Sequence, residues 1–171
     1  MKNLLQGSWL GHPLHPAIVH IPSALWPAAI VFDVLTLFGV GGNPLVRASF
    51  LAIAVGLITA AVAIPTGLAD WWGIKRGRPA WQLGLFHLIL NASATALFAA
   101  SFLFRLDGWR TDDQVGVIPF ILAILGAGAL GQGGYFGGKM AFDYGISVAR
   151  VSKDEWRETA EAGGARLPEK G

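Results

Sequence analysis

The second quarter of the chain contains an uninterrupted apolar stretch, ASFLAIAVGLITAAVAIPTGLA, residues 48–69. It holds no charged side chain, and it exceeds the roughly 20 residues that a helix needs to cross about 30 Å of hydrocarbon. Three further mostly apolar stretches lie at residues 17–39, 83–104 and 115–138. The composition agrees, because 53% of the residues are hydrophobic and only 14% are charged. The sequence therefore predicts a polytopic membrane protein with four transmembrane helices.

The connections between these stretches are short and contain the turn residues expected where helices stop, such as Gly41-Gly42-Asn43-Pro44. Short connections make successive helices antiparallel, so we expect an all-α, up-down four-helix bundle over residues 1–148. Both termini then share one membrane face with the second connection. That face carries most of the positive charge: Lys2, Lys75, Arg76, Arg78, Lys139 and Arg150. The positive-inside rule predicts cytoplasmic termini.

The last segment, residues 149–171, is polar. Ser152-Lys153-Asp154-Glu155 has the spacing of a capping box that opens a helix, and Gly163-Gly164 would close it. We expect a cytoplasmic tail with one short, solvated helix.

The charge and the residue types exclude several function classes. The absence of cysteine removes thiolate metal sites, protein-ligated iron–sulfur clusters and c-type haem attachment. The net charge of +2 is spread over the connections, so no basic surface for nucleic acid is expected. No nucleophile motif and no HExxH motif is present, which makes an electron carrier or a binding protein more plausible than a stand-alone enzyme.

Two histidines precede prolines at the start of the first span, in Gly11-His12-Pro13-Leu14-His15-Pro16. A residue before proline is pushed toward extended backbone, so we expect His12 and His15 to point the same way along an extended path. Pro16 would be the first residue of the helix, with His15 as its cap.

Two more histidines fall inside the spans, and such groups are functional candidates by default. His20 and His87 lie at similar distances from the starts of spans one and three, so we expect them at equal depth below the same face. Asn91 follows His87 by one helical turn. Asp70 ends span two at this face, where it could accept the second ring N–H of a ligating histidine or pair with Lys75 or Arg76.

Asp33 lies in the other half of span one, away from the histidines. The simplest expectation is an ion pair with Arg47 or Arg105, with a proton relay as the alternative. Span four is rich in glycine, and such a surface admits either another helix, including one from a second copy of the chain, or a flat macrocycle.

Several motifs in this order resemble a bacterial membrane family catalogued as domain of unknown function 2231. They are Gly11–Pro16 with His20 and Pro22, Asp33-Val34-Leu35, Gly67–Asp70, His87 with Asn91, and Gly137-Gly138 with Tyr144-Gly145. The resemblance covers residues 11 to about 148, with Ile21 and Phe142 at positions where the family pattern has Phe and Tyr. Family members are sometimes fused to a Rieske or cytochrome-like domain, so the resemblance implies a redox context without an established activity.

These observations leave three hypotheses. The first is a b-type cytochrome-like electron carrier that holds haem b between spans one and three through His20 and His87, with a quinone or a redox protein as partner. The second is a divalent transition-metal site made by His12, His15, His20 and His87 with Asp70. The third is a structural subunit of a membrane redox complex, in which the histidines anchor helix ends.

Overall fold

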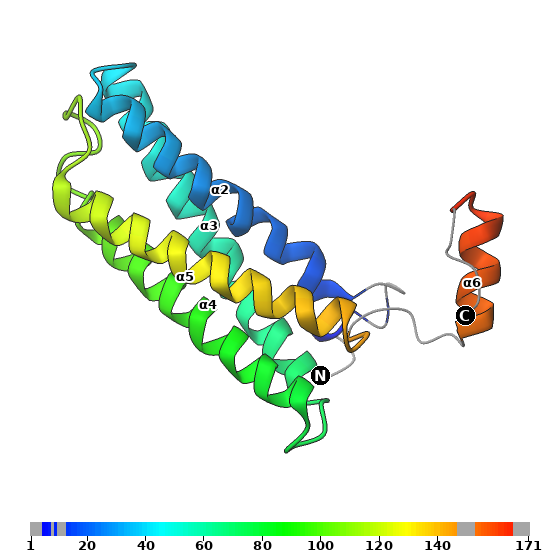
Figure 1. The fold of residues 1–171 in the computed structure, drawn as a ribbon. Coiled ribbons are helices and arrows are strands. Elements are labelled where there is room, and N and C mark those ends of the chain that lie inside the picture. Colours follow the sequence, from blue (N-terminus) through cyan, green and yellow to red (C-terminus); the bar gives the residue numbers. More distant parts are fainter. Residues whose placement is uncertain (1–4, 8, 10–12, 147–152, 166–171) are drawn as a thin grey trace.

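The computed structural model describes residues 5–7, 9, 13–146 and 153–165 of the chain. Four long helices follow one another: α2 (Leu14–Leu37), α3 (Gly42–Trp71), α4 (Pro79–Leu103) and α5 (Val117–Phe142). A short helix, α6 (Lys153–Ala162), comes after them. The α2–α3 and α4–α5 connections lie at one end of the bundle and the α3–α4 connection lies at the other, as Figure 1 shows. The long helices are therefore antiparallel to their neighbours in the chain.

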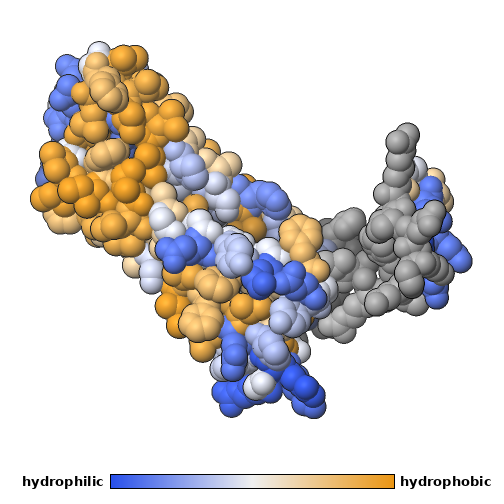
Figure 2. All heavy atoms as spheres, in the orientation of Figure 1, coloured by the Kyte–Doolittle hydropathy of each residue, from blue (hydrophilic) through white to orange (hydrophobic). Residues whose placement is uncertain are grey.

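All four long helices are long and apolar enough to cross a membrane. Large apolar side chains stay exposed along them, for example Ile58 and Val117, which a bilayer would cover. Figure 2 shows hydrophobic side chains over much of the bundle face in view, and hydrophilic ones mainly in the half with the α3–α4 connection and at the edge of the opposite end. The chain is an integral membrane protein with four spanning helices, and the all-α class expected from the sequence is confirmed in the described residues.

The start of the first spanning helix differs from the sequence expectation. α2 begins at Leu14, after Pro13 in extended conformation, and its N-terminus has no side-chain cap. The prediction that His15 caps a helix starting at Pro16 was therefore wrong. The first four N–H groups of a helix have no partner within it, so Pro16 fits into the first turn without the loss of a hydrogen bond. His15 is consequently a helical residue.

The helices pack as two hairpins. α2 packs mainly on α3, and α4 packs mainly on α5. The centre of the bundle is the stacked ring pair Trp26 and Phe98, whose centroids are 4.4 Å apart. Gly56 of α3 lies against the Trp26 ring and Gly126 of α5 lies against the Phe98 ring, each so closely that a methyl group would collide with the ring. Glycine on the partner helix within each hairpin thus lets the two large rings meet.

A buried ion pair joins the hairpins on one side of this ring pair. The carboxylate of Asp33 receives two hydrogen bonds from the guanidinium of Arg105, at 2.6 and 2.8 Å, and both residues are buried. The guanidinium also donates to the hydroxyls of Ser49 and Ser101, and Ser101 donates to the Pro119 carbonyl. All four long helices meet at this network. The expected ion pair of Asp33 is confirmed, with Arg105 as its partner.

The two hairpins are related by a constant spacing. Three pairs face each other across them, and in each pair the second residue follows the first by 72 residues: His15 and His87, Trp26 and Phe98, Asp33 and Arg105. On α3 and α5, 70 residues separate Gly56 from Gly126 and Gly67 from Gly137. Equivalent positions therefore pair with each other, which is the relation of two subunits about a two-fold axis. The bundle is a pseudo-dimer of hairpins within one chain.

The short helix α6 has the predicted end. Gly164 has φ +88° and follows Gly163, whose N–H bonds to the Thr159 carbonyl. Glycine is the residue that adopts this left-handed conformation without strain. The predicted cap residue Ser152 lies outside the described residues.

Candidate functional site

The hairpins line a partly open cavity of about 530 Å³ on the other side of the central ring pair from the ion pair. Most of its lining is aliphatic or glycine, and its polar side chains are few. Residues from all four long helices contribute, including His15, Trp26, Gly67, His87 and Gly137. Its size and its largely apolar lining with a few polar groups are typical of ligand pockets, which span roughly 300–1,000 Å³.

His15 of α2 and His87 of α4 face each other in this cavity. Their ring centroids are 6.1 Å apart and the ring planes stand at 85°. The two imidazoles come from different hairpins and occupy equivalent positions of the pseudo-dimer. The pair therefore lies on the axis that relates the two halves.

Each of these rings is held by a backbone carbonyl of its own hairpin. Nδ1 of His15 lies 2.9 Å from the Ala63 carbonyl oxygen, and Nδ1 of His87 lies 2.8 Å from that of Gly133. A carbonyl only accepts, so both Nδ1 atoms carry the proton and donate it. Each neutral ring then has its lone pair on Nε2, which is the form that binds a metal ion.

Glycine makes room for both rings. A Cβ added to Gly67 would lie 2.6 Å from the His15 ring, and one added to Gly137 would lie 2.9 Å from the His87 ring. Each glycine stands four residues after the carbonyl that accepts the ring proton, Ala63 and Gly133. Glycines of α3 and α5 thus leave the space that the two histidine rings occupy.

The other predicted site residues take different places. His20 lines the cavity and is exposed, and its Nδ1 bonds to the Pro16 carbonyl on the preceding turn of α2. Asn91 lines the cavity, and its side-chain amide donates to the His87 carbonyl at 2.8 Å. Asp70 lines the cavity at the end of α3, but the acceptors of all three histidine Nδ1 atoms are carbonyls. His12 lies outside the described residues.

A comparison with models of protein families finds a match over most of the chain. A family described as "Predicted membrane protein (DUF2231)" matches residues 11–150. The chain belongs to this family. No curated protein and no solved structure matches the chain.

The DUF2231 match spans all four long helices and thus includes both halves of the pseudo-dimer and both facing histidines. From their depth in the spans, His20 and His87 were expected to form the ligand pair. The ring that faces His87 is instead that of His15. The reason is an offset between the hairpins. α4 begins eight residues before His87, whereas α2 begins one residue before His15, so α4 extends about 10 Å further past the pair.

Within the described part of this DUF2231 chain, no group of three or more His, Asp or Glu side chains is close enough to hold a metal ion. The expected multi-histidine site with Asp70 therefore has no support from the described residues. What the site offers is a pair of opposed imidazoles.

A signal for the facing pair is present in the sequence. His15, Trp26 and Asp33 have the same mutual spacing as His87, Phe98 and Arg105. The residue types differ at two of the three positions, so the repeated spacing cannot be recognised as a set of facing pairs until the contacts are known.

Proposed function

We propose that this protein is a membrane b-type cytochrome-like electron carrier that binds haem b between α2 and α4, with His15 and His87 as the axial ligands. One observation carries the proposal: two imidazoles face each other across a mostly apolar cavity, each with its Nδ1 proton donated to a carbonyl. Imidazole pairs ligate haem iron without any cysteine. This pair replaces the one formed by His20 and His87 in the sequence expectation.

The separation of the rings supports two ligands on opposite sides of one metal ion. A metal–nitrogen bond is about 2 Å long and the ring centre lies about 1 Å beyond the nitrogen, so opposed imidazoles have centres about 6 Å apart. The observed separation is 6.1 Å. Two corners of a tetrahedral site would bring the ring centres about 1 Å closer, which makes that geometry the poorer fit.

The walls of the cavity also fit a flat macrocycle. Gly134, Gly137 and Gly138 of α5 line it, as do Gly67 of α3 and Gly84 of α4. Glycines leave flat wall surfaces, and an apolar lining excludes water. The pseudo-two-fold axis adds a further argument, because it gives a ligand two equivalent sides, as an ion with two identical axial ligands requires.

Haem iron with two histidine ligands passes single electrons to and from a partner. The chain's own residues would orient and bury it: the carbonyls of Ala63 and Gly133 fix the rings, and the α5 glycines make space. We place the protein in the bacterial cytoplasmic membrane, with its termini in the cytoplasm and a quinone or a redox protein as its partner.

A reduced-minus-oxidised visible spectrum of the purified protein tests the proposal. Protein expressed with ample haem should show a Soret band and the sharp visible bands of a six-coordinate b-type cytochrome, at one haem per chain. A preparation without a Soret band would overturn the proposal. A stoichiometric non-haem metal in the elemental analysis, with no haem, would do the same.

Gly137→Ala should weaken haem binding about tenfold or more, the loss typical when the support of a ligand is disturbed. The added methyl group displaces the His87 ring from its bond to Gly133. Gly131→Ala is the matched control, because Gly131 lies on the same helix, does not line the cavity and has nothing within 4 Å of an added Cβ. Haem titration of both apoproteins measures the difference, and equal affinities would contradict the assigned role of His87.

A further inference from the structure

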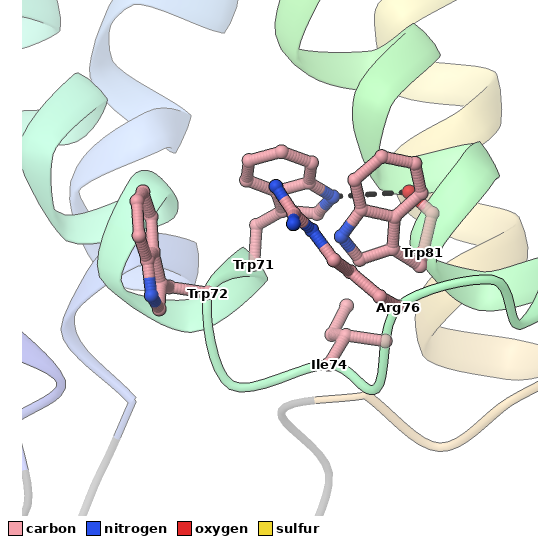
Figure 3. A pocket seen from close by; sticks show the side chains of 5 residues that line it. All are labelled: Trp71, Trp72, Ile74, Arg76 and Trp81. Carbon is pink, nitrogen blue, oxygen red and sulfur yellow. Dashed lines mark hydrogen bonds between the residues drawn. The ribbon is translucent and has the colours of Figure 1, made fainter.

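A second cavity, of about 290 Å³, lies at the α3–α4 connection. It is lined by Trp71, Trp72, Ile74, Arg76 and Trp81, which Figure 3 shows around one hollow, with the Arg76 side chain extending toward the indoles. The Trp71 and Trp81 rings stack with centroids 5.0 Å apart, and Nε1 of Trp71 donates to the Trp81 carbonyl at 3.0 Å. The stacking and the hydrogen bond thus hold the indole rings of Trp71 and Trp81, which form flat walls of the cavity, in place.

The polar side-chain atoms of this cavity are all donors. Indole and guanidinium groups carry N–H donors and no acceptor, and Ile74 carries neither. Within the described residues, the indole N–H groups of Trp72 and Trp81 have no acceptor, and Arg76 has no carboxylate partner. Trp72 is 71% exposed. A ligand that suits this set is negatively charged and rich in acceptor oxygens.

The position of the cavity at the end of two spanning helices indicates that its ligand is amphiphilic. It lies where two apolar spanning helices end, the level at which tryptophan prefers to sit in a bilayer. The same connection carries two further exposed cations, Lys75 and Arg78, and no acidic residue. Basic pockets at the ends of spanning helices bind the headgroups of anionic lipids, and the indole faces can cover the glycerol and the first acyl carbons.

We propose that this cavity binds one anionic glycerophospholipid, with its phosphate on Arg76 and its glycerol region against the tryptophan faces. The site adjoins the histidine cavity, because Trp71 and Ile74 line both, but Trp72, Arg76 and Trp81 line only this one. It gives the protein a specific lipid contact at the face where the α3–α4 connection lies.

The test is a lipid titration of the full-length protein in neutral detergent, followed by native mass spectrometry. Phosphatidylglycerol should bind as one tightly retained molecule, and phosphatidylcholine should bind more weakly. Arg76→Gln should weaken the first phosphatidylglycerol by about tenfold or more, because it removes charge-assisted hydrogen bonds.

Arg78→Gln is the matched control, since it removes the same charge from the same connection at a residue that does not line the cavity. Its loss should stay within about fivefold, the effect of one cation near a charged membrane surface. Equal losses in the two variants would overturn the proposal, because they indicate attraction by net charge alone. Displacement of phosphatidylglycerol by inorganic phosphate would overturn it too, in favour of a site for small anions. Both positions are exposed, and melting temperatures establish that the variants fold.

Discussion

His15→Ala and His87→Ala are each expected to abolish the six-coordinate cytochrome spectrum. Each variant removes one of the two opposed imidazoles, and no other histidine ring faces the remaining one among the described residues. A five-coordinate haem in a mostly apolar cavity is held by one bond instead of two, so most of the haem should be lost on purification. The reduced-minus-oxidised spectrum and the haem-to-protein ratio measure the change.

His20→Ala is the control that separates this ligand pair from the one expected from the sequence. The ring that faces His87 is that of His15 and not that of His20, so removal of the His20 side chain should leave the spectrum intact. Loss of the spectrum in His20→Ala, with retention in His15→Ala, would restore the pair of His20 and His87. A His87→Gly variant supplied with free imidazole gives a further check, because refilling the vacated space should restore the six-coordinate spectrum.

Asp33→Ala is expected to destabilise the bundle by about 3–5 kcal/mol, the usual result of leaving one member of a buried ion pair without its partner. The guanidinium of Arg105 would stay buried and keep only its two serine hydroxyls. Arg105→Ala should have a similar effect, because it leaves the Asp33 carboxylate buried and removes the link between the hairpins. Unfolding by denaturing detergent in mixed micelles measures the free energy.

Two comparisons decide what such a loss means. Arg47→Ala removes the other cation considered for Asp33, which lies over the Trp109 ring instead, and it should cost no more than about 1 kcal/mol. The double variant Asp33→Leu with Arg105→Met should recover most of the lost stability, since apolar side chains of similar size often replace a buried pair without penalty. A loss in Arg105→Ala no larger than that in Arg47→Ala would show that the pair does not hold the hairpins together.

The sequence was sufficient for the features that depend on composition and periodicity. Charge-free stretches such as residues 48–69 predict spanning helices because hydrocarbon cannot solvate an open backbone. The ion pair of Asp33 followed from the same reasoning, because a carboxylate at that depth needs a cation and few are available. The helical spacing of Gly56, Ala60, Ala63 and Gly67 is typical of a face for close helix packing, and three of these residues are buried while Gly67 abuts the His15 ring.

The identity of the facing histidines depends on quantities that the residues alone do not give. Pro16 suggested a helix that starts there, yet proline is equally acceptable two positions further into the first turn, where His15 becomes helical. The offset of α4 relative to α2 is set by how the hairpins pack, so equal distances from the helix starts did not mean equal depth. The ring supports are carbonyls of Ala63 and Gly133, and every residue has a carbonyl, so no side chain indicated them.

The ion pair between Asp33 and Arg105 has a consequence for how the two halves recognise each other. These residues occupy equivalent positions on the axis, so a hairpin paired with a copy of itself would place two carboxylates or two guanidiniums in contact. Like charges that meet in a buried site cost several kcal/mol, whereas the mixed pair is satisfied. The mixed pair therefore favours association of the two different hairpins of one chain over association of two copies of the same hairpin.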